Sequence, residues 1–548
     1  MGENPKAVPQ PELTLRQRQI LKLLQAGMVN KEVARELDIG VGTVKQHIVA
    51  LFKKLNVSNR AMAVSRGMDI RHKQENQNTT LMVDGLLERR PCVVLTVALP
   101  GEASQRAVRL MYGALAALAS ANDAIFLTRQ GNAGDVIFGI QHVTVYDVAI
   151  ALQTARTVYD DLLALDPDMA ENMRGCLTAG LAIASMKRLG GWTGEALASA
   201  VIASARELLG NTPPGQITFD SAALDLIEVF GIGGQQEVLP VLPFHKLKNL
   251  HWTGSRRVYP LVGRDTELAI LDVALKETTQ GHGRLIHIEG ETGMGKSRLC
   301  EEIMQHCLGL GGRAAFYRSL PAVLGMSLYD AAGKTDCSIE NVVAALNAKP
   351  AFSPDLIIVD DFHLLLREQQ LLLSAACATA VKNGKLVIFS GRRGASKRSD
   401  YPAETITLRR LPAKAIEALV RGTLGKGVIK GKASKIREIS GMAAGVPLFA
   451  VELTRHHDLQ QLALPLLVVI SARLDSLHLD RNLLRAVAKN STATTLEEIA
   501  ATLNEDVELL RQQAERTVAV GVLSWDATGG LSFNHPLLRR AIDSLVME

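Results

Sequence analysis

The sequence lacks any apolar run long enough to cross a bilayer. Its longest, residues 462–470, is about half of the roughly 20 residues that a membrane helix needs. The first ten residues contain no apolar core of a secretory signal. The six cysteines form no CxxC pair, which argues against a disulfide framework or a zinc ribbon and predicts reduced core residues. We therefore expect a cytoplasmic protein with no membrane partner.

Length and charge divide the chain unevenly. With 548 residues, 47% of them hydrophobic, the chain should hold three or more globular domains. Residues 1–75 carry 13 Lys and Arg against 7 Asp and Glu, so this short segment exceeds the net charge of +5 of the whole chain. A basic N-terminal unit beside neutral domains indicates nucleic-acid binding, and a merely solvated basic surface is the alternative.

The N-terminal unit predicts a DNA-binding helix. Residues 13–70 read as four short helices, the third of which buries Val44, Ile48, Leu51, Phe52 and Leu55 on one stripe. Its other face is polar and cationic, which suits the major groove, although an ordinary amphipathic helix has the same pattern. The string TVKQH followed by KKLNVSNR resembles the LuxR-type helix-turn-helix. The resemblance implies that the DNA-contacting residues are Thr43, Val44, Lys45, His47, Lys53, Lys54, Asn59 and Arg60. The family usually has Glu at position 17 and often a capping Ser at position 40, where this chain has Gln17 and Gly40.

A phosphate-binding loop follows an apolar strand in the middle of the chain. The string GETGMGKS, residues 290–297, separates the strand LIHI from a predicted helix. Its glycines let backbone amides surround phosphate oxygens, Lys296 reaches the outer phosphates and the Ser297 hydroxyl can hold Mg²⁺. The glycines of the loop are Gly290, Gly293 and Gly295. We expect ATP or ADP with Mg²⁺ at this site.

Two later strands supply charge to the same sheet edge. The strand LIIVDD ends in Asp360, a predicted Mg²⁺ ligand, and Asp361, which we expect to orient the attacking water. A buried strand with an acidic turn is the alternative interpretation. The strand KLVIFSGRR places Arg392 and Arg393 where a cation senses the terminal phosphate.

These motifs together resemble the STAND class of signal-transduction NTPases, in particular the ATPase core of large LuxR-type regulators. YPLVGRDTEL (259–268) resembles the box that closes over the base, with Val262, Gly263 and Arg264. GMAAGVPLFAVEL (441–453) resembles the helical lid of that class. LSFNHPLLRRAI (531–542) resembles part of its winged helix, with His535 near the position that reads the nucleotide. Members usually continue into a helical-repeat sensor, which this sequence does not contain, so we expect the signal to enter elsewhere.

The segment between these units has an α/β pattern. RPCVVLTVALPG, GNAGDVIFG, GWTGEALASAV and PPGQITFDSAAL, in this order, resemble a class III nucleotidyl cyclase homology domain. In that family two Asp residues hold two metal ions, and their positions here are Ala98 and Asn132. The transition-state Asn and Arg fall at Ala198 and Ile202. The resemblance implies a fold that has lost cyclase chemistry and serves as a sensor or a dimerisation surface.

The predicted fold class is multidomain: an all-α helix-turn-helix, a cyclase-like α/β sandwich with a ferredoxin-like core, and an α/β P-loop NTPase with a helical lid and a winged helix. The expected boundaries are 1–72 for the DNA-binding unit, 73–88 for a linker, 89–235 for the cyclase-like domain, 236–258 for a second linker, 259–407 for the NTPase core, 408–463 for the lid and 464–548 for the winged helix.

The predicted function is an ATP-dependent transcriptional regulator. We expect it to bind double-stranded promoter DNA, to self-associate and to respond to a small-molecule or protein effector, with at most slow ATP hydrolysis. The alternatives are an active cyclase tethered to DNA and a signalling or defence NTPase that acts through protein partners. Ala98 and Asn132 argue against the first, and TVKQH on a basic unit argues against the second.

Overall fold

The computed structural model describes residues 86–129, 132–230, 232–233, 239–249, 251–252, 259–319, 328–330, 336–350, 355–392, 394, 403–424, 433–456, 461–490 and 493–547. The chain divides into two units after residue 84. The first unit lies outside the described residues, and so do all predicted DNA-contacting residues and Arg393. Four successive parts of the chain are distinguished below. They are the N-terminal unit, the first region (86–252), the second region (259–407) and the C-terminal region (408–547).

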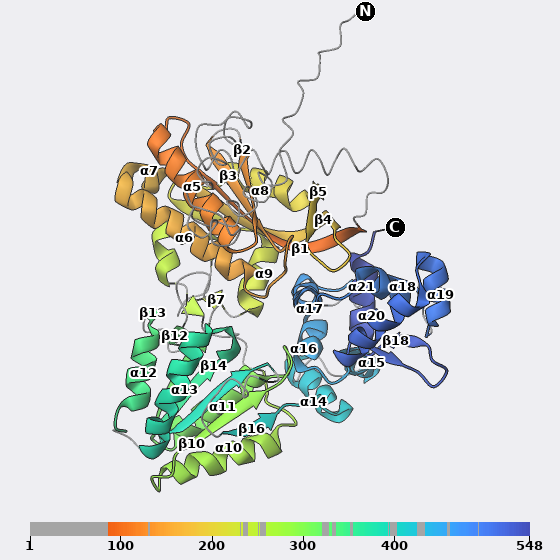
Figure 1. Ribbon diagram of the computed structural model, residues 1–548. Helices are drawn as coiled ribbons and strands as arrows, with labels where there is room; N and C mark the ends of the chain where they lie inside the picture. The colour runs from red at the N-terminus through yellow and green to blue at the C-terminus, as the bar shows by residue number, and fades with distance from the viewer. Residues whose placement is uncertain are drawn as a thin grey trace, which may run out of the picture. The chain divides into compact units, whose positions relative to one another are not determined.

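The first region is a mainly antiparallel sheet with helices on both faces (Figure 1). The strand order is β2-β3-β1-β4-β6-β8, and β5 pairs with β4. Alternate residues of β1 point to opposite faces, so that Val93, Leu95 and Val97 pack in the core with α5, α6 and α9, while Cys92 and Val94 pack in the core with α8. The elements are β1 (Leu86–Ala98), α5 (Gln105–Ala121), β2 (Ile125–Arg129), β3 (Ala133–Phe138), α6 (Asp147–Leu165), α7 (Pro167–Asn172), β4 (Arg174–Met186), β5 (Trp192–Ala198), α8 (Ala200–Gly210), β6 (Gln216–Phe219), α9 (Ser221–Val229), β7 (Ile232–Gly233), β8 (Val241–Pro243), η1 (Phe244–Asn249) and β9 (His251–Trp252).

The boundaries of the first region differ from the expected ones. Strand β1 begins at Leu86, inside the predicted linker 73–88. The predicted linker 236–258 contains β8, which pairs with β6, and Phe244, whose buried ring stacks on Tyr159. Strand β8 has three residues and ends at a proline, so its pattern is too short to be recognised as a strand in the sequence.

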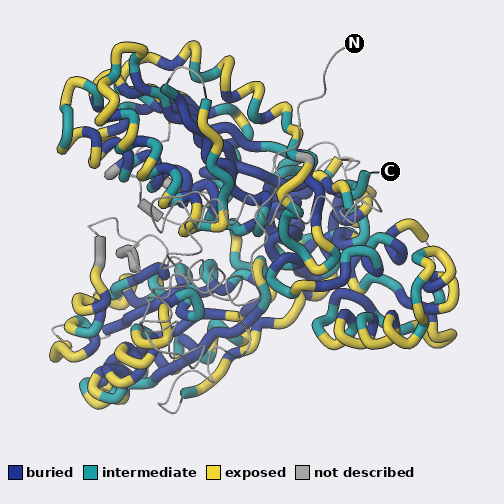
Figure 2. The backbone as a smooth tube through the Cα atoms, turned by 45° about the horizontal axis from the view of Figure 1, so that its top comes forward, coloured by how far each residue is buried: buried dark blue, intermediate teal, exposed yellow. Residues whose placement is uncertain are grey.

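The second region is a sheet in which five strands run parallel in the order β11-β14-β15-β10-β16, with β12 and β13 added antiparallel beyond β11. All six residues of β14 and of β15 are buried, because helices cover both faces of the sheet. Figure 2 shows these strands as a buried centre between exposed helical surfaces. The elements are α10 (Asp265–Thr278), β10 (Arg284–Glu289), α11 (Lys296–Gly309), β11 (Arg313–Ser319), β12 (Leu328–Asp330), β13 (Asp336–Cys337), α12 (Ile339–Asn347), β14 (Asp355–Asp360), η3 (Phe362–Leu364), α13 (Arg367–Lys382), β15 (Leu386–Gly391) and β16 (Glu404–Thr407).

In its described residues the C-terminal region is helical, apart from the hairpin of β17 and β18. The predicted lid corresponds to α14–α16 and the predicted winged helix to α17–α21 with β17 and β18. Side-chain caps define the starts of α18 to α21, as at α19, where Thr495 and Glu498 form a capping box. The elements are α14 (Ala413–Leu424), α15 (Ala433–Ala443), α16 (Pro447–Arg455), α17 (Leu464–Leu477), α18 (Arg481–Lys489), α19 (Leu496–Leu503), α20 (Val507–Ala519), β17 (Leu523–Trp525), β18 (Leu531–Phe533) and α21 (Pro536–Leu545).

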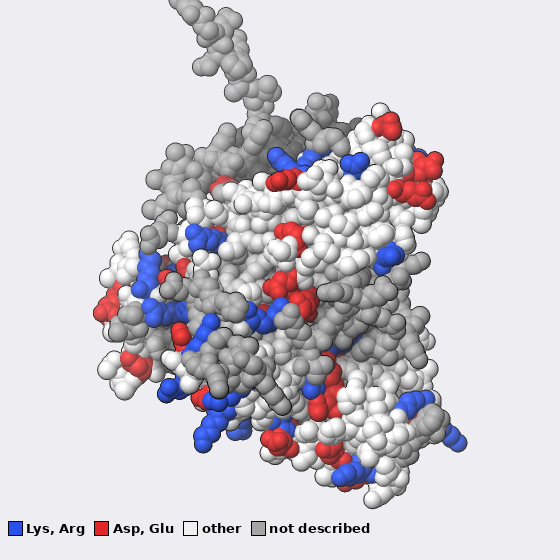
Figure 3. Space-filling model, turned by 180° about the vertical axis from the view of Figure 1, so that it is seen from behind, with Lys and Arg blue, Asp and Glu red and all other residues white. Residues whose placement is uncertain are grey.

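The described residues contain buried free cysteines and a surface of mixed charge. Among the described residues, no helix has both the length and the apolar character that a membrane crossing requires. Cys92, Cys176, Cys300, Cys307 and Cys377 are buried free thiols, which confirms for these five the prediction of reduced core residues. On the face shown in Figure 3, acidic and basic side chains lie interspersed over the described surface.

Candidate nucleotide site

The phosphate loop lies between β10 and the N-terminus of α11. Gly293 and Gly295 have φ angles of +83° and +88°, in the left-handed region that glycine adopts without strain. Gly295 directly precedes α11, whose first-turn amides point toward the loop and favour an anion. Lys296 is 8% exposed, and its Nζ donates to the carbonyl oxygens of Gly290 and Glu291, 3.1 Å from each. The loop therefore has the backbone geometry of a phosphate cradle.

Of the two predicted carboxylates, Asp360 is the last residue of β14 and Asp361 follows it. Strand β15 separates β14 from β10. Asp360 is buried, accepts a hydrogen bond from Ser390 Oγ and lies 3.6 Å from Arg318 Nε. Its Oδ2 accepts no hydrogen bond from the described residues. Asp361 has a φ of +54°, and its amide donates to Ser390 Oγ at 3.1 Å. Burial and the neighbouring Asp360 raise the pKa of the Asp361 carboxyl.

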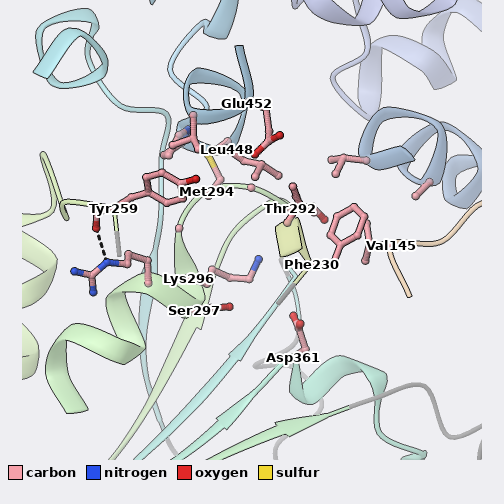
Figure 4. Close-up of a pocket in the computed structure, with 18 of the residues that line it drawn as sticks. Val145, Phe230, Tyr259, Thr292, Met294, Lys296, Ser297, Asp361, Leu448 and Glu452 are labelled. Atoms are coloured by element: carbon pink, nitrogen blue, oxygen red, sulfur yellow. Dashed lines mark hydrogen bonds between the residues drawn. The ribbon is translucent and has the colours of Figure 1, made fainter. Parts of the chain in front are cut away.

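A cavity of about 530 Å³ opens over the loop and Asp361. Figure 4 shows Lys296 and Asp361 between Tyr259 on one side and Phe230 and Val145 on the other. The predicted site residues that line the cavity are Val262, Arg264, Gly293, Gly295, Lys296, Ser297, Asp361 and Arg392. The cavity lining does not include Gly263, Gly290, Asp360 or His535. Its size is within the usual range of ligand pockets.

Residues 262–264, from the box that is expected to close over the base, contact the phosphate loop and its neighbours. Arg264 is 4% exposed and donates to the carbonyl oxygens of Met294, at 3.1 Å, and Arg409, at 2.8 Å. Gly263 has a φ of +65°, and a Cβ there would lie 2.9 Å from Ala415 of the lid. Arg264 therefore links the phosphate loop to the segment after β16, Gly263 lies against α14, and Val262 lines the cavity.

His535 lies behind the cavity wall. It is 1% exposed, its Nδ1 accepts from the Leu537 amide at the start of α21, and its Nε2 lies 3.0 Å from the Ala443 carbonyl oxygen. With Nδ1 accepting, the proton is on Nε2. Burial lowers the pKa of His535 to about 4. The segment after Ala443 reaches the phosphate loop, where the Leu448 amide donates to the Gly293 carbonyl oxygen at 3.2 Å.

The four positions that the resemblance to cyclases assigns to catalytic residues form no metal-binding group within the described part of the chain. Ala98 pairs with Ala133 across β1 and β3. Asn132 has a φ of +53°, and its Nδ2 donates to the Pro100 carbonyl oxygen at 3.1 Å. Ala198 ends β5, and the Ile202 carbonyl oxygen on α8 accepts from Arg129. Within the described part of the chain, no three His, Cys, Asp or Glu side chains gather as a metal-binding group.

Sequence reasoning missed the residues that complete the cavity from distant segments. Arg473 on α17 pairs with Glu291 of the phosphate loop at 3.0 Å. Tyr146, just before α6, donates from its hydroxyl to Asp361 Oδ2 at 3.2 Å. Phe230, Val145 and Glu452 also line the wall. Glu452 lies in the segment 441–453 that resembles the lid of the STAND class. The other four residues lie in none of the motifs quoted above, so no local signal marks them.

Comparison with known proteins matches two segments of the chain. Residues 11–66 match the family described as "Bacterial regulatory proteins, luxR family", and residues 260–322 match the "AAA ATPase domain". The Escherichia coli protein "Putative HTH-type transcriptional regulator YhjB" is 51% identical over 51 residues, which are 9% of this chain and 26% of that protein. Eight curated relatives are each matched over 7 to 31% of their own length.

Solved structures also match parts of the chain, among them an ATPase and a guanylyl cyclase. A Walker-type ATPase of Pyrococcus abyssi is 15% identical, with a TM-score of 0.36, and the match covers 52% of this chain and 96% of that one. The guanylyl cyclase Cya2 is 18% identical, with a TM-score of 0.23, and the match covers 28% of this chain and 87% of that one. By sequence, the chain therefore combines a DNA-binding segment of the luxR family with a segment of the AAA ATPase domain.

Proposed function

We propose that this protein is a transcription regulator whose binding to promoter DNA is controlled by ATP. The observation that carries the proposal is the cavity in which the phosphate loop and Asp361 face each other, in a chain whose residues 11–66 match DNA-binding regulators. The luxR match is the support for double-stranded DNA as the partner. One such unit reads a single half-site, so we propose that promoter recognition needs at least two copies of the chain.

The residues at the cavity fit a nucleoside triphosphate with Mg²⁺. The loop amides and Lys296 would hold the phosphates, and Ser297, which lines the cavity, would hold the metal. Asp360 is buried directly before the cavity-lining Asp361, with Oδ2 3.6 Å from Arg318 Nε, and would be a second metal ligand, directly or through water. Bound Mg²⁺ supplies neutralisation of phosphate charge. Asp361 orients the attacking water, and Arg392 lines the same cavity as a cation for the terminal phosphate.

We propose that the first region is a sensor or self-association surface without cyclase activity. Ala98 supplies no metal ligand, and Asn132 donates its amide hydrogen to a backbone carbonyl where a metal site needs a carboxylate. Formation of cyclic AMP by the purified protein with ATP and Mg²⁺ or Mn²⁺ would contradict this part of the proposal and favour a DNA-tethered cyclase.

The test compares promoter-DNA binding by the full chain with ATP, with ADP and without nucleotide. We expect the Lys296→Ala variant to bind ATP about 100-fold more weakly and to lose the nucleotide dependence of DNA binding. Lys276→Ala is the matched control, since Lys276 is exposed at the end of α10. Fluorescence anisotropy of labelled nucleotide and labelled DNA gives both quantities. An unchanged ATP response in Lys296→Ala would overturn the proposed control by ATP.

A further inference from the structure

The wall of the nucleotide cavity opposite Tyr259 comes from the first region. The segment 142–146, between β3 and α6, lines the cavity, and so does the segment 228–230 at the end of α9. Figure 4 shows Val145 and Phe230 beside the space above Asp361. The nucleotide site is therefore composite, with walls from the phosphate-loop region, the C-terminal region and the proposed sensor region.

One polar contact reaches from this wall to the proposed water-orienting group. The Tyr146 hydroxyl donates to Asp361 Oδ2 at 3.2 Å, across 215 positions of sequence. A hydrogen bond to a carboxylate is stronger than one between neutral groups, so it holds the acceptor in place. It also uses a lone pair of the oxygen that would otherwise accept from water.

The segment that carries Tyr146 is fixed to α17. The Val143 amide donates to Asp475 Oδ2 at 2.8 Å, and Arg90 of β1 donates to Asp475 Oδ1 at 3.1 Å. Asp475 and Arg90 are both buried, so this anchor lies within the protein interior. Tyr146 therefore holds its position through a rigid attachment three residues away.

The same helix is also fixed to the phosphate loop. Arg473 pairs with Glu291 at 3.0 Å, and Glu291 is one of the two residues whose carbonyl oxygens accept from Lys296. Residues two positions apart on a helix point about 200° apart. Arg473 and Asp475 therefore connect opposite sides of α17 to the phosphate loop and to the first region.

We propose that the first region restrains ATP turnover through Tyr146. The hydrogen bond from its hydroxyl holds Asp361 until a signal at the first region moves the segment 142–146. We call this contact the latch. The proposal rests on the proposed function, because it needs ATP to be hydrolysed at this cavity. The latch assigns the first region a direct contact with the nucleotide site. Tyr146 acts through Asp361 and is a positioning residue.

The test removes one hydroxyl from the full-length protein. We expect Tyr146→Phe to raise the turnover number for ATP about tenfold and to change the dissociation constant of a fluorescent ATP analogue less than twofold. Without nucleotide, hydrogen exchange of the backbone amides of residues 142–146 should become faster. The control is Tyr112→Phe, which removes a hydroxyl that donates to the Arg129 and Ala133 carbonyl oxygens in the same region, away from the cavity.

The outcomes separate the latch from the proposed function. If wild type binds ATP and Lys296→Ala does not, but Tyr146→Phe has the turnover of wild type and of Tyr112→Phe, the latch is overturned and the proposed function stands. Slower turnover in Tyr146→Phe also overturns the latch, since Tyr146 would then assist the reaction. If wild type neither binds nor hydrolyses ATP, the proposed function itself fails.

Discussion

The first and second regions both place a turn with a left-handed residue beside the end of a buried strand. In the first region that residue is Asn132, whose side-chain amide donates to the Pro100 carbonyl oxygen. In the second region it is Asp361, whose carboxylate faces a cavity of about 530 Å³. The difference shows that backbone geometry alone does not make a site. A reactive site also needs charged groups and open volume.

The pH dependence of stability should give the largest difference between the first region, which contains Asp147, and the second and C-terminal regions, which contain His287 and His535. Burial lowers the pKa of His287 and of His535 to about 4, and burial raises the pKa of Asp147 in the first region to about 7. Between pH 6.5 and 4 the unfolded chain protonates His535 while the folded chain does not. Stability is therefore lost as pH falls through this window, by up to about 3 kcal/mol for His535. Asp147 acts in the opposite direction, because its folded form keeps a proton up to about pH 7.

The variant His535→Asn isolates the histidine contribution. An Asn oxygen can accept from the Leu537 amide as an N-cap but does not titrate. We expect the variant to lose less stability than wild type when urea unfolding is compared at pH 7 and pH 5. An equal loss in both proteins would show that His535 is protonated in the folded state.

Replacing one glycine in the phosphate loop and one in the loop after β1 should affect ATP affinity differently. Gly295→Ala places a Cβ at a φ of +88°, which costs about 1–2 kcal/mol unless the loop rearranges. We expect the rearranged phosphate loop to bind ATP at least tenfold more weakly, about 1.4 kcal/mol. Gly101, in the loop after β1, has open space around its Cβ position and no left-handed φ, so Gly101→Ala should leave affinity unchanged. Equal nucleotide titrations for the two variants would remove the loop from the proposed site.

Restoring one carboxylate should not restore a metal site in the first region. Asn132→Asp replaces a donor to the Pro100 carbonyl oxygen by a second acceptor, so we expect a stability loss of about 1 kcal/mol. Ala98 still supplies no ligand, so the variant should make no cyclic nucleotide with Mn²⁺. Thermal unfolding and product separation measure the two effects. Cyclase activity in this single variant would show that the first region is one substitution from function.

Local patterns made the phosphate site predictable from sequence. Strand, loop and helix around Lys296 are contiguous, so their spacing fixes their geometry. The contacts of Tyr146 and Arg473 join segments far apart in the chain, and a single sequence carries no periodicity that pairs them. Strand β8 was missed because three residues show no alternation. Arg264 matched its motif, but its bonds to the Met294 and Arg409 carbonyls depend on packing that no motif encodes.

The attachment of α17 to both sides of the site has a thermodynamic consequence. Because Arg473 and Asp475 share one helix, a displacement that weakens one attachment also alters the other. Coupled binding equilibria are reciprocal. An effector that binds the first region and changes the affinity for ATP by some factor must itself be bound more or less tightly, by the same factor, when ATP is present. The concentration of ATP in the cell would then set the effector concentration at which this protein responds.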